Sequence, residues 1–430
     1  MKGDLQSNEY KVGGWRAHYI LIICSLLYMV NYMDRQVLSA VLEPMKQDLG
    51  LSDTQAGSLM TVFLLSIALF SLPLAYMVDR WSRRKAIALM AIFWSAFTFI
   101  TGLGKSFLGV LIPRSLVGVG EAGFSSGGTA MLAAVYPPES RGRVMGVFNL
   151  VIPLGASLGV ILGGYLSKNH GGWQTPFFVF AIPGIILGIL AFFMKDYKTV
   201  DHVDESGRKK GFLSAAVSLF RIPTLKWLYI GYGVRNIMNF SVLVWLSAFL
   251  MRSQNIAEDR AGMLSGMVFL MAILGALAGG ILSDTWQRKN RRARMLLPVI
   301  GDMLASIVLI VAVTLDMKGP GFVVVLLWGA MVMIGTPPLT AVTQDVVTPA
   351  VKGLSYGMSV FSMYVFGGGW GPIMVGGISD ALGGGAEGLK SAFYFIALAG
   401  FVAAFLLWLG SRHYPGDMDK VKGAVLQAEK

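Results

Sequence analysis

Twelve long apolar stretches dominate this sequence of 430 residues. A helix needs about 20 mostly apolar residues to cross a lipid bilayer, and each stretch reaches that length. The composition agrees, because 55% hydrophobic and 14% charged residues are more apolar side chain than one soluble core can bury. We therefore expect an all-α membrane protein with twelve transmembrane helices, at residues 17–42, 54–77, 85–104, 106–134, 144–167, 174–194, 225–250, 261–283, 294–315, 321–344, 354–379 and 389–411.

Basic residues indicate how these spans are oriented. Twelve spans place both termini on one side of the membrane, and most of the 36 Lys and Arg lie on that side. Positively charged loops are retained in the cytoplasm, so we expect a multi-pass protein of the cell (inner) membrane with both termini cytoplasmic. The net charge of +12 is carried in short loops such as residues 80–85 and 288–294. This placement favours contacts with anionic membrane lipids over binding of nucleic acid.

A polar segment divides the chain into two units. Residues 195–224 are rich in charge and end in a semi-apolar stretch at 211–222. This pattern predicts a cytoplasmic linker that ends in an interfacial helix, with a solvated loop as the alternative. We expect one six-helix bundle at residues 1–194 and a second at residues 225–430.

The two units repeat each other. At an offset of 205 residues, Asn31-Tyr-Met-Asp34 aligns with Asn236-Ile-Met-Asn239. At the same offset, an Asp-x-Trp-x-Arg pattern occurs at residues 79–83 and again at residues 284–288. Parallel repeats in transporters are related by an axis along the membrane normal, so we expect two pseudo-symmetric bundles.

Residues 74–85, LAYMVDRWSRRK, resemble the loop motif between the second and third spans of the major facilitator superfamily, although Ala75 and Ser82 replace glycines that are usual there. Two further stretches, NYMDRQVLSAVLEPMKQDLGLSD and RSLVGVGEAGFSSG, resemble the Spinster family of lysolipid and sphingosine-phosphate transporters. The resemblance implies a proton-coupled carrier of an amphipathic, lysophospholipid-like substrate. It also implies that this substrate enters a cavity between the two bundles.

Charged residues inside the spans mark the candidate site. Each costs about 2.5–3.5 kcal/mol to insert, so such groups persist where they face a cavity or a partner. They are Asp34 and Arg35 in the first span, Arg114 and Glu121 in the fourth and Arg235 in the seventh. Arg114 and Glu121 are two helical turns apart and share a face. Asp34 and Arg35 point about 100° apart, so we expect Asp34 to pair with another helix, such as the fourth.

These residue types suggest two kinds of role. We predict that Asp34 and Glu121 are proton-coupling sites, because a carboxylate that gains and loses an arginine partner can load and release a proton. A permanent ion pair between the first and fourth spans is the alternative. We predict that Arg35, Arg114 and Arg235 bind a phosphate or carboxylate headgroup, since a guanidinium offers a bidentate fork. Charge balance for the two acids is the alternative.

The repeat alignment makes the two bundles unequal. Asn239 stands where the first bundle has Asp34, and valines stand near the positions of Arg114 and Glu121. We therefore expect ion coupling in the first bundle and a largely neutral second bundle, with Asn236 and Asn239 as substrate contacts or as interhelical hydrogen-bond partners. Asp302 lies near an expected helix end, where we predict a structural role.

The two loop motifs supply a candidate cytoplasmic gate. We expect these residues to latch helices and to set topology without touching substrate. They are Asp79, Arg80, Arg84, Asp284 and Arg288.

Together these features predict a proton-coupled secondary active transporter of an amphipathic anionic solute that works as a monomer by alternating access. A carrier of a water-soluble organic anion or sugar phosphate would use the same charges. A channel or a transport-dead receptor is a more distant alternative. No nucleotide motif, paired metal ligands or nucleophile elbow occurs in the sequence, so we expect no cofactor, no metal site and no enzymatic activity.

Overall fold

The computed structural model describes residues 14–196, 212–315, 319, 321–348 and 351–428. Helices cover all twelve expected spans, which confirms the all-α prediction. In the described residues, ten helices are long and apolar enough to cross a membrane, and one further apolar helix is shorter. The first half consists of α1 (Trp15–Leu49), α2 (Asp53–Arg80), α3 (Arg83–Gly102), α4 (Phe107–Glu121), α5 (Phe124–Val135), α6 (Pro138–Asn169) and α7 (Thr175–Ala191).

The second half follows a short helix, α8, in the segment expected to be a linker. Residues 197–211 of that segment lie outside the described residues, whereas α8 packs Ala216 and Leu219 into a small apolar cluster of the second half. The helices of this half are α8 (Phe212–Leu219), α9 (Pro223–Gln254), α10 (Glu258–Gln287), α11 (Ala293–Thr314), α12 (Gly321–Ile334), α13 (Thr336–Asp345), α14 (Lys352–Met363), η2 (Tyr364–Gly368), α15 (Gly371–Ala381) and α16 (Gly385–Ala428).

Three spans are broken where the local sequence disfavours a continuous α-helix. The fourth span changes from α4 to α5 across Ala122 and Gly123, and the tenth changes from α12 to α13 just before Pro337 and Pro338. The eleventh contains a π-helical turn, η2, at its glycine-rich centre. Proline removes an N–H donor and glycine weakens a helix, so these sequences account for the breaks.

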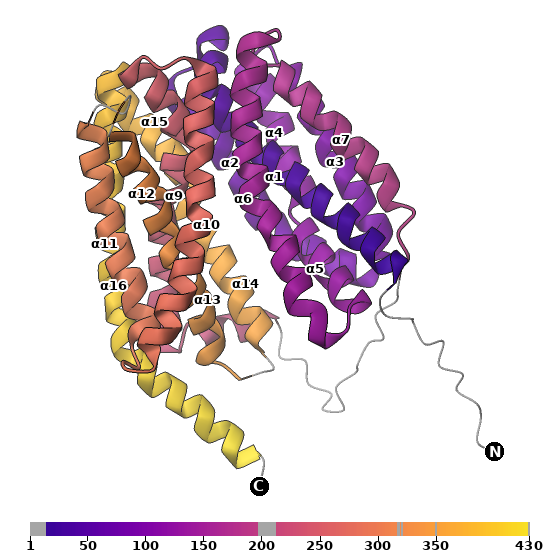
Figure 1. Cartoon of the computed structure of the whole chain (residues 1–430), viewed down its shortest axis with the longest axis vertical. Helices are drawn as coiled ribbons and strands as arrows, with labels where there is room; N and C mark the ends of the chain where they lie inside the picture. The colour runs from indigo at the N-terminus through magenta and orange to yellow at the C-terminus, as the bar shows by residue number, and fades with distance from the viewer. Residues whose placement is uncertain (1–13, 197–211, 316–318, 320, 349–350, 429–430) are drawn as a thin grey trace, which may run out of the picture.

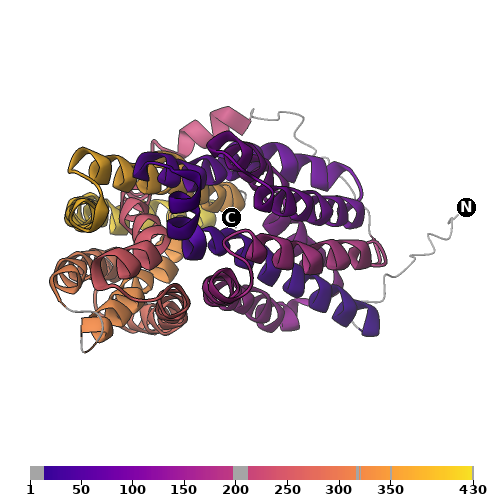
Figure 2. The same cartoon turned by 90° about the horizontal axis from the view of Figure 1, so that it is seen from above.

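The helices form two bundles that lie side by side (Figures 1 and 2). α1 begins and α16 ends at the same end of the molecule, which we call the terminal side; the opposite end is the far side. The bundles meet through α6 against α10, α2 against α15 and α1 against α9. Toward the far side, a Cβ added to Gly57 would lie 2.3 Å from the carbonyl oxygen of Pro372, and α6 and α10 meet at Gly164 and Gly262. Glycine therefore permits direct backbone contact between the halves.

Serine side chains define where three N-terminal helices begin. Ser52 accepts a hydrogen bond from the main chain of Gln55 and forms a capping box at the start of α2. Ser82 accepts from Lys85 and caps α3, and Ser106 caps α4 in the same way. A side chain that satisfies a free N–H at a helix start stabilises it by about 1 kcal/mol. Ser82, which departs from the family motif, thus has a local function as a helix cap.

Candidate functional site

A cavity of about 540 Å³ lies between the two halves. Its polar lining comes mainly from α1, α9, α13 and η2, whereas α2 and α10 contribute only apolar side chains. Apolar lining residues include Met60, Phe63, Phe240, Phe269 and Leu277. The polar and charged lining residues are Tyr32, Arg35, Gln36, Asn149, Tyr232, Asn236, Thr336 and Tyr364. The cavity lining therefore combines one cation and several polar groups with a larger apolar surface. An amphipathic ligand has the same combination of a polar headgroup and an apolar chain.

Arg35 connects this cavity to a buried acid. Its Nε atom donates to Oε2 of Glu121 at 2.7 Å, so α1 and α4 are joined by an ion pair. The Glu121 side chain is 0% exposed and that of Arg35 is 11% exposed. The guanidinium carbon of Arg35 also lies 4.7 Å from the centre of the Tyr32 ring. Arg35 is thus placed between a buried carboxylate on one side and the cavity on the other.

Asp34 points to a different helix from the one expected. Its carboxylate accepts a hydrogen bond from Thr98 of α3 at 2.7 Å, so the expected pairing with the fourth span is wrong for this carboxylate. The fourth span reaches only the main-chain oxygen of Asp34, through Nη1 of Arg114 at 3.3 Å. The angle between neighbouring positions on a helix explains why Asp34 faces α3 while Arg35 faces α4.

Arg114 does not line the cavity, although we predicted that it binds the substrate headgroup. It is fully buried, and its guanidinium stacks 4.5 Å above the ring of Phe63, which does line the cavity. Its Nε and Nη2 atoms are buried without a hydrogen-bond partner among the described residues, as is Oδ1 of Asp34. Unsatisfied buried groups of this kind are costly, so this cluster retains capacity for a further ligand or proton.

The second half is not neutral, contrary to our expectation. Arg235 of α9 and Asp302 of α11 form an ion pair at 2.9 Å, with side chains that are 1% and 0% exposed. Asp302 lies well inside α11, so its predicted position near a helix end is wrong. Arg235 does not line the cavity in this conformation, because its guanidinium is turned toward Asp302. The repeat alignment missed the pair because neither residue has a charged counterpart in the first half.

The two predicted asparagine contacts are placed differently from each other. Asn236 lines the cavity, and its side chain also donates to the main-chain oxygen of Tyr232 at 2.7 Å. Asn239 is buried away from the cavity, and its side-chain atoms have no hydrogen-bond partner among the described residues.

Of the five predicted gate residues, the three whose side chains the structure describes make no hydrogen bond or ion pair between the halves in this conformation. The side chains of Asp79 and Arg80 lie outside the described part of the structure. Arg84 donates to the main-chain oxygen of Met194 at 3.3 Å, within the first half. The other two gate residues, Asp284 and Arg288, do not act together: Asp284 pairs with another arginine, and Arg288 is exposed.

The partner of Asp284 is Arg294, which the sequence did not single out. Arg294 binds Asp284 and Asp345 at 2.8 Å each, and the hydroxyl of Tyr414 donates to Asp345 at 2.5 Å. These contacts join α10, α11, α13 and α16 within the second half. Only a list of basic residues near the start of the ninth span could have indicated Arg294 from the sequence.

A charged cluster on the far side was also missed. Arg252 donates to both oxygens of Asp53, at 2.8 and 2.9 Å, and to Glu43 at 2.5 Å. Lys46 binds Asp53 at 2.6 Å. Asp380 of α15 accepts from the main chain of Asp53 at 3.0 Å and so caps the start of α2. We call these five residues, Glu43, Lys46, Asp53, Arg252 and Asp380, the latch. It joins the halves on the far side, so this conformation is held closed there.

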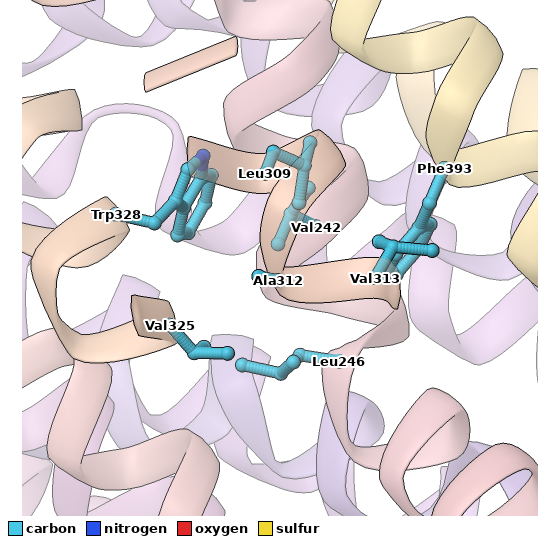
Figure 3. Close-up of a pocket in the computed structure, with 8 residues that line it drawn as sticks. All are labelled: Val242, Leu246, Leu309, Ala312, Val313, Val325, Trp328 and Phe393. Carbon is cyan, nitrogen blue, oxygen red and sulfur yellow. The ribbon is translucent and has the colours of Figure 1, made fainter. Parts of the chain in front are cut away.

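A second, much smaller void lies inside the second half (Figure 3). It holds about 10 Å³ and is lined by apolar side chains of α9, α11, α12 and α16. Trp328 lines both this void and the large cavity. An apolar void of this size holds at most about one water molecule, so it is a packing feature behind the cavity wall.

Comparison with known proteins supports a transporter. A model of the Major Facilitator Superfamily matches residues 24–372. An MFS-type efflux pump of Mycolicibacterium smegmatis is 27% identical over 419 residues, which cover 94% of this chain and 95% of that protein. The sphingosine-1-phosphate transporter SPNS2 of Mus musculus is 24% identical over 381 residues, which cover 84% of this chain and 69% of that protein.

A solved structure has the same fold. It is the crystal structure of a bacterial homolog to the human lysosomal transporter Spinster, in an inward-facing and unoccupied conformation. The TM-score is 0.85 at 23% identity, and the match covers 94% of this chain and 99% of that one. The resemblance to Spinster proteins inferred from the sequence is confirmed. This multi-pass integral membrane protein belongs to the major facilitator superfamily, and it is a Spinster-like transporter rather than an enzyme.

Proposed function

We propose that the protein is a proton-coupled secondary transporter of an amphipathic anionic solute, of the lysophospholipid or sphingosine-phosphate class. The observation that carries this proposal is the division of the cavity between a polar part beside Arg35 and an apolar part along α2 and α10. A phosphate or carboxylate headgroup would bind the guanidinium of Arg35, and an acyl chain would lie along the apolar walls. The name of the mouse relative supports this class of substrate.

The outer wall of the cavity suits entry from the membrane. Leu150 of α6 and Leu277 of α10 both line the cavity, and they are 48% and 61% exposed. α6 and α10 are in contact near the far side and separate toward the terminal side (Figure 1). A lipid chain would pass between these two helices with its headgroup inside the cavity. A solute without an acyl chain would have no need of this opening.

Proton coupling would operate through Glu121 and Asp34. A proton bound by Glu121 would neutralise its carboxylate and weaken the ion pair with Arg35. The guanidinium of Arg35 would then be available to the anionic headgroup. Loss of that proton would restore the ion pair and displace the substrate. Asp34, whose Oδ1 atom is buried without a partner among the described residues, would act as a second site for a proton in the same cluster.

Alternating access would then require the latch to open. In the present conformation the latch holds the far side closed, and α6 and α10, which line the cavity, separate toward the terminal side. We propose that the terminal side is cytoplasmic in the cell (inner) membrane. We further propose that residues 1–194 and 225–430 rock as two bundles within a monomer, joined by the linker at 195–224, while Asp79, Arg80, Arg84, Asp284 and Arg288 close the terminal side in the other state.

A flux assay tests this proposal. Purified protein would be reconstituted in liposomes, and uptake of radiolabelled sphingosine-1-phosphate and of oleoyl-lysophosphatidate would be measured with and without an imposed proton gradient. We expect saturable uptake that the gradient stimulates and that a protonophore abolishes. Empty liposomes are the control for passive flip of the lipid. Uptake that ignores both the gradient and the protonophore would refute proton coupling, and no saturable uptake of either lipid would refute the substrate class.

A water-soluble organic anion is the second candidate. The uncharged hydrogen-bonding groups that line the cavity, such as Gln36, Asn149 and Thr336, could also bind the hydroxyl groups of a sugar phosphate. Competition distinguishes the two candidates. If glucose 6-phosphate blocked uptake of the labelled lysolipid at a lower concentration than unlabelled lysolipid did, the water-soluble substrate would be favoured.

A further inference from the structure

The tenth span is broken beside the cavity. Pro337 and Pro338 follow directly after the junction of α12 and α13, and neither has an N–H to donate to the carbonyl one turn earlier. Three residues at this break, Val332, Met333 and Thr336, line the cavity. The carbonyls of Met333 and Ile334 therefore cannot receive the usual backbone hydrogen bonds from residues 337 and 338.

The side chain of Arg235 supplies donors at this break. Its Nη2 atom donates to the main-chain oxygen of Val332 at 2.6 Å, and its Nη1 atom donates to the hydroxyl of Thr336 at 3.2 Å. Gly335 lies between these two acceptors, and a Cβ there would be 3.1 Å from Nη2 of Arg235. A glycine at the break thus leaves room for the guanidinium, which bridges the end of α12 and the start of α13.

Asp302 fixes the guanidinium in this position. The Nε atom of Arg235 lies 3.0 and 3.2 Å from the two carboxylate oxygens of Asp302, and Nη2 lies 2.9 Å from one of them. All three guanidinium nitrogens are therefore engaged by protein groups. Both side chains are almost completely buried and Arg235 does not line the cavity, so an anionic substrate would have to displace these contacts to reach the guanidinium.

We propose that Arg235 is a positioning residue, held by Asp302, that sets the shape of the cavity wall at the broken tenth span. It supplies a donor to the main-chain oxygen of Val332 at the end of α12 and ties α9, α11 and the α12–α13 junction to one another. We call Arg235 and Asp302 the clamp. Tyr232 and Asn236, which flank Arg235 on α9, also line the cavity, so the clamp aligns the α9 wall with the wall at the α12–α13 junction. This inference goes beyond the proposed function, since it holds whichever solute the cavity accepts.

Cysteine labelling tests the clamp without any substrate. Cys24 is the only cysteine and is buried, so Cys24→Ala gives a background free of thiols. Met333→Cys then reports on the wall at the break, and Asn149→Cys reports on the opposite wall, on α6. The labelling rate with N-ethylmaleimide would be compared between Arg235 and Arg235→Lys. Lysine retains the positive charge for Asp302 but does not have three nitrogens with which to bind three partners at once.

We expect Arg235→Lys to raise the labelling rate at Met333→Cys about fivefold, the equivalent of one lost hydrogen bond, and to leave the rate at Asn149→Cys unchanged. Thr336→Val removes one acceptor of Arg235 and leaves the ion pair, so it should raise the labelling rate at Met333→Cys by a smaller factor. This variant replaces Arg235→Lys in the test if the lysine variant does not fold. Arg294→Lys is the matched control, because that arginine binds two acids in the same half but does not line the cavity.

Two results would overturn the proposal. If the labelling rate at Met333→Cys were unchanged in both Arg235→Lys and Thr336→Val, Arg235 and Asp302 would only neutralise each other's charge and would not position the cavity wall. An equal increase at Met333→Cys and Asn149→Cys would show a general loosening of the fold. Neither result depends on proton coupling or on the lipid assay, so failure of the clamp and failure of the proposed function are distinguishable.

Discussion

The two halves each bury an arginine beside an acid, yet the surroundings of the two pairs differ. Arg35 and Glu121 lie at the edge of the cavity, next to Asp34 and Arg114, both of which have buried polar atoms without a partner among the described residues. Arg235 and Asp302 are buried behind the wall, and every guanidinium nitrogen of Arg235 has an acceptor. A group with unused hydrogen-bonding capacity can exchange partners, whereas a saturated one holds its neighbours in place.

The largest effect is expected when the ion pair of Arg235 and Asp302 is broken. Asp302→Ala should lower the free energy of unfolding by about 3–5 kcal/mol, because it leaves the charge of Arg235 buried and uncompensated. The measurement is the thermal unfolding midpoint in detergent micelles, with Asp302→Asn as the control that keeps the size and one acceptor of the side chain. If Asp302→Ala had the same thermal unfolding midpoint as the wild type, the stability of the second half would not depend on this ion pair.

Prediction from the sequence succeeded where a property depends on composition along one helix. The apolar lengths predict the spans. It failed where a property depends on how helices face each other. Because Asp34 and Arg35 are neighbours in a helix, the sequence predicts that their side chains point in different directions. Their partners, Thr98 and Glu121, are set by the packing of α1 against α3 and α4, which the sequence does not give.

The charges of the second half were missed for a related reason. Arg235 and Asp302 are 67 residues apart, and the pairing depends on the depth at which α9 and α11 cross, which loose span boundaries do not give. The latch was missed because its residues lie at the ends of different helices. Arg252 and Asp53 each stand at a helix end, where charged residues are ordinary, and nothing local indicates that they meet.

The next prediction concerns the unsaturated cluster. Glu121→Gln should reduce gradient-driven uptake by about 10-fold to 100-fold, the range of a typical coupling free energy, because an amide cannot bind and release the proton. Exchange of labelled for unlabelled lipid without a gradient should persist, since Arg35 and the cavity remain. The matched variant Asp302→Asn should retain stimulation by the gradient. If both variants lost it equally, the two halves would not differ in the way their contacts suggest.

A smaller effect is expected at Thr98, whose hydroxyl positions Asp34. Thr98→Val keeps the shape of the side chain but removes the hydrogen bond to Oδ2 of Asp34. Gradient-driven uptake should fall about fivefold, as expected for one lost hydrogen bond, and Thr98→Ser should restore it. Uptake would be measured in the same liposomes as for Glu121→Gln. A valine variant with normal uptake would remove Asp34 from the coupling site and leave Glu121 as its acid.

The latch contains an exposed carboxylate, Asp380, and so tests whether a full set of hydrogen bonds stabilises the fold without burial. Asp380 accepts three hydrogen bonds from Asp53 and Thr54, so it is as well satisfied as Asp302, but it is exposed. Burial alone would raise the pKa of Asp380, and these donors from Thr54 and Asp53 outweigh it and hold the pKa below the usual value.

A lowered pKa means that this contribution is complete above the unfolded value of about 3.9 and is lost only as the pH falls through the lower folded value. Asp380→Asn should therefore lower the free energy of unfolding by at most about 1 kcal/mol, because solvent screens the exposed carboxylate, and equally at pH 5.5 and pH 7.5. Thermal unfolding midpoints of variant and wild type at the two pH values provide the measurement. A cost that disappears at pH 5.5 would show that the latch titrates in the physiological range, and proton sensitivity would then not be confined to the first half.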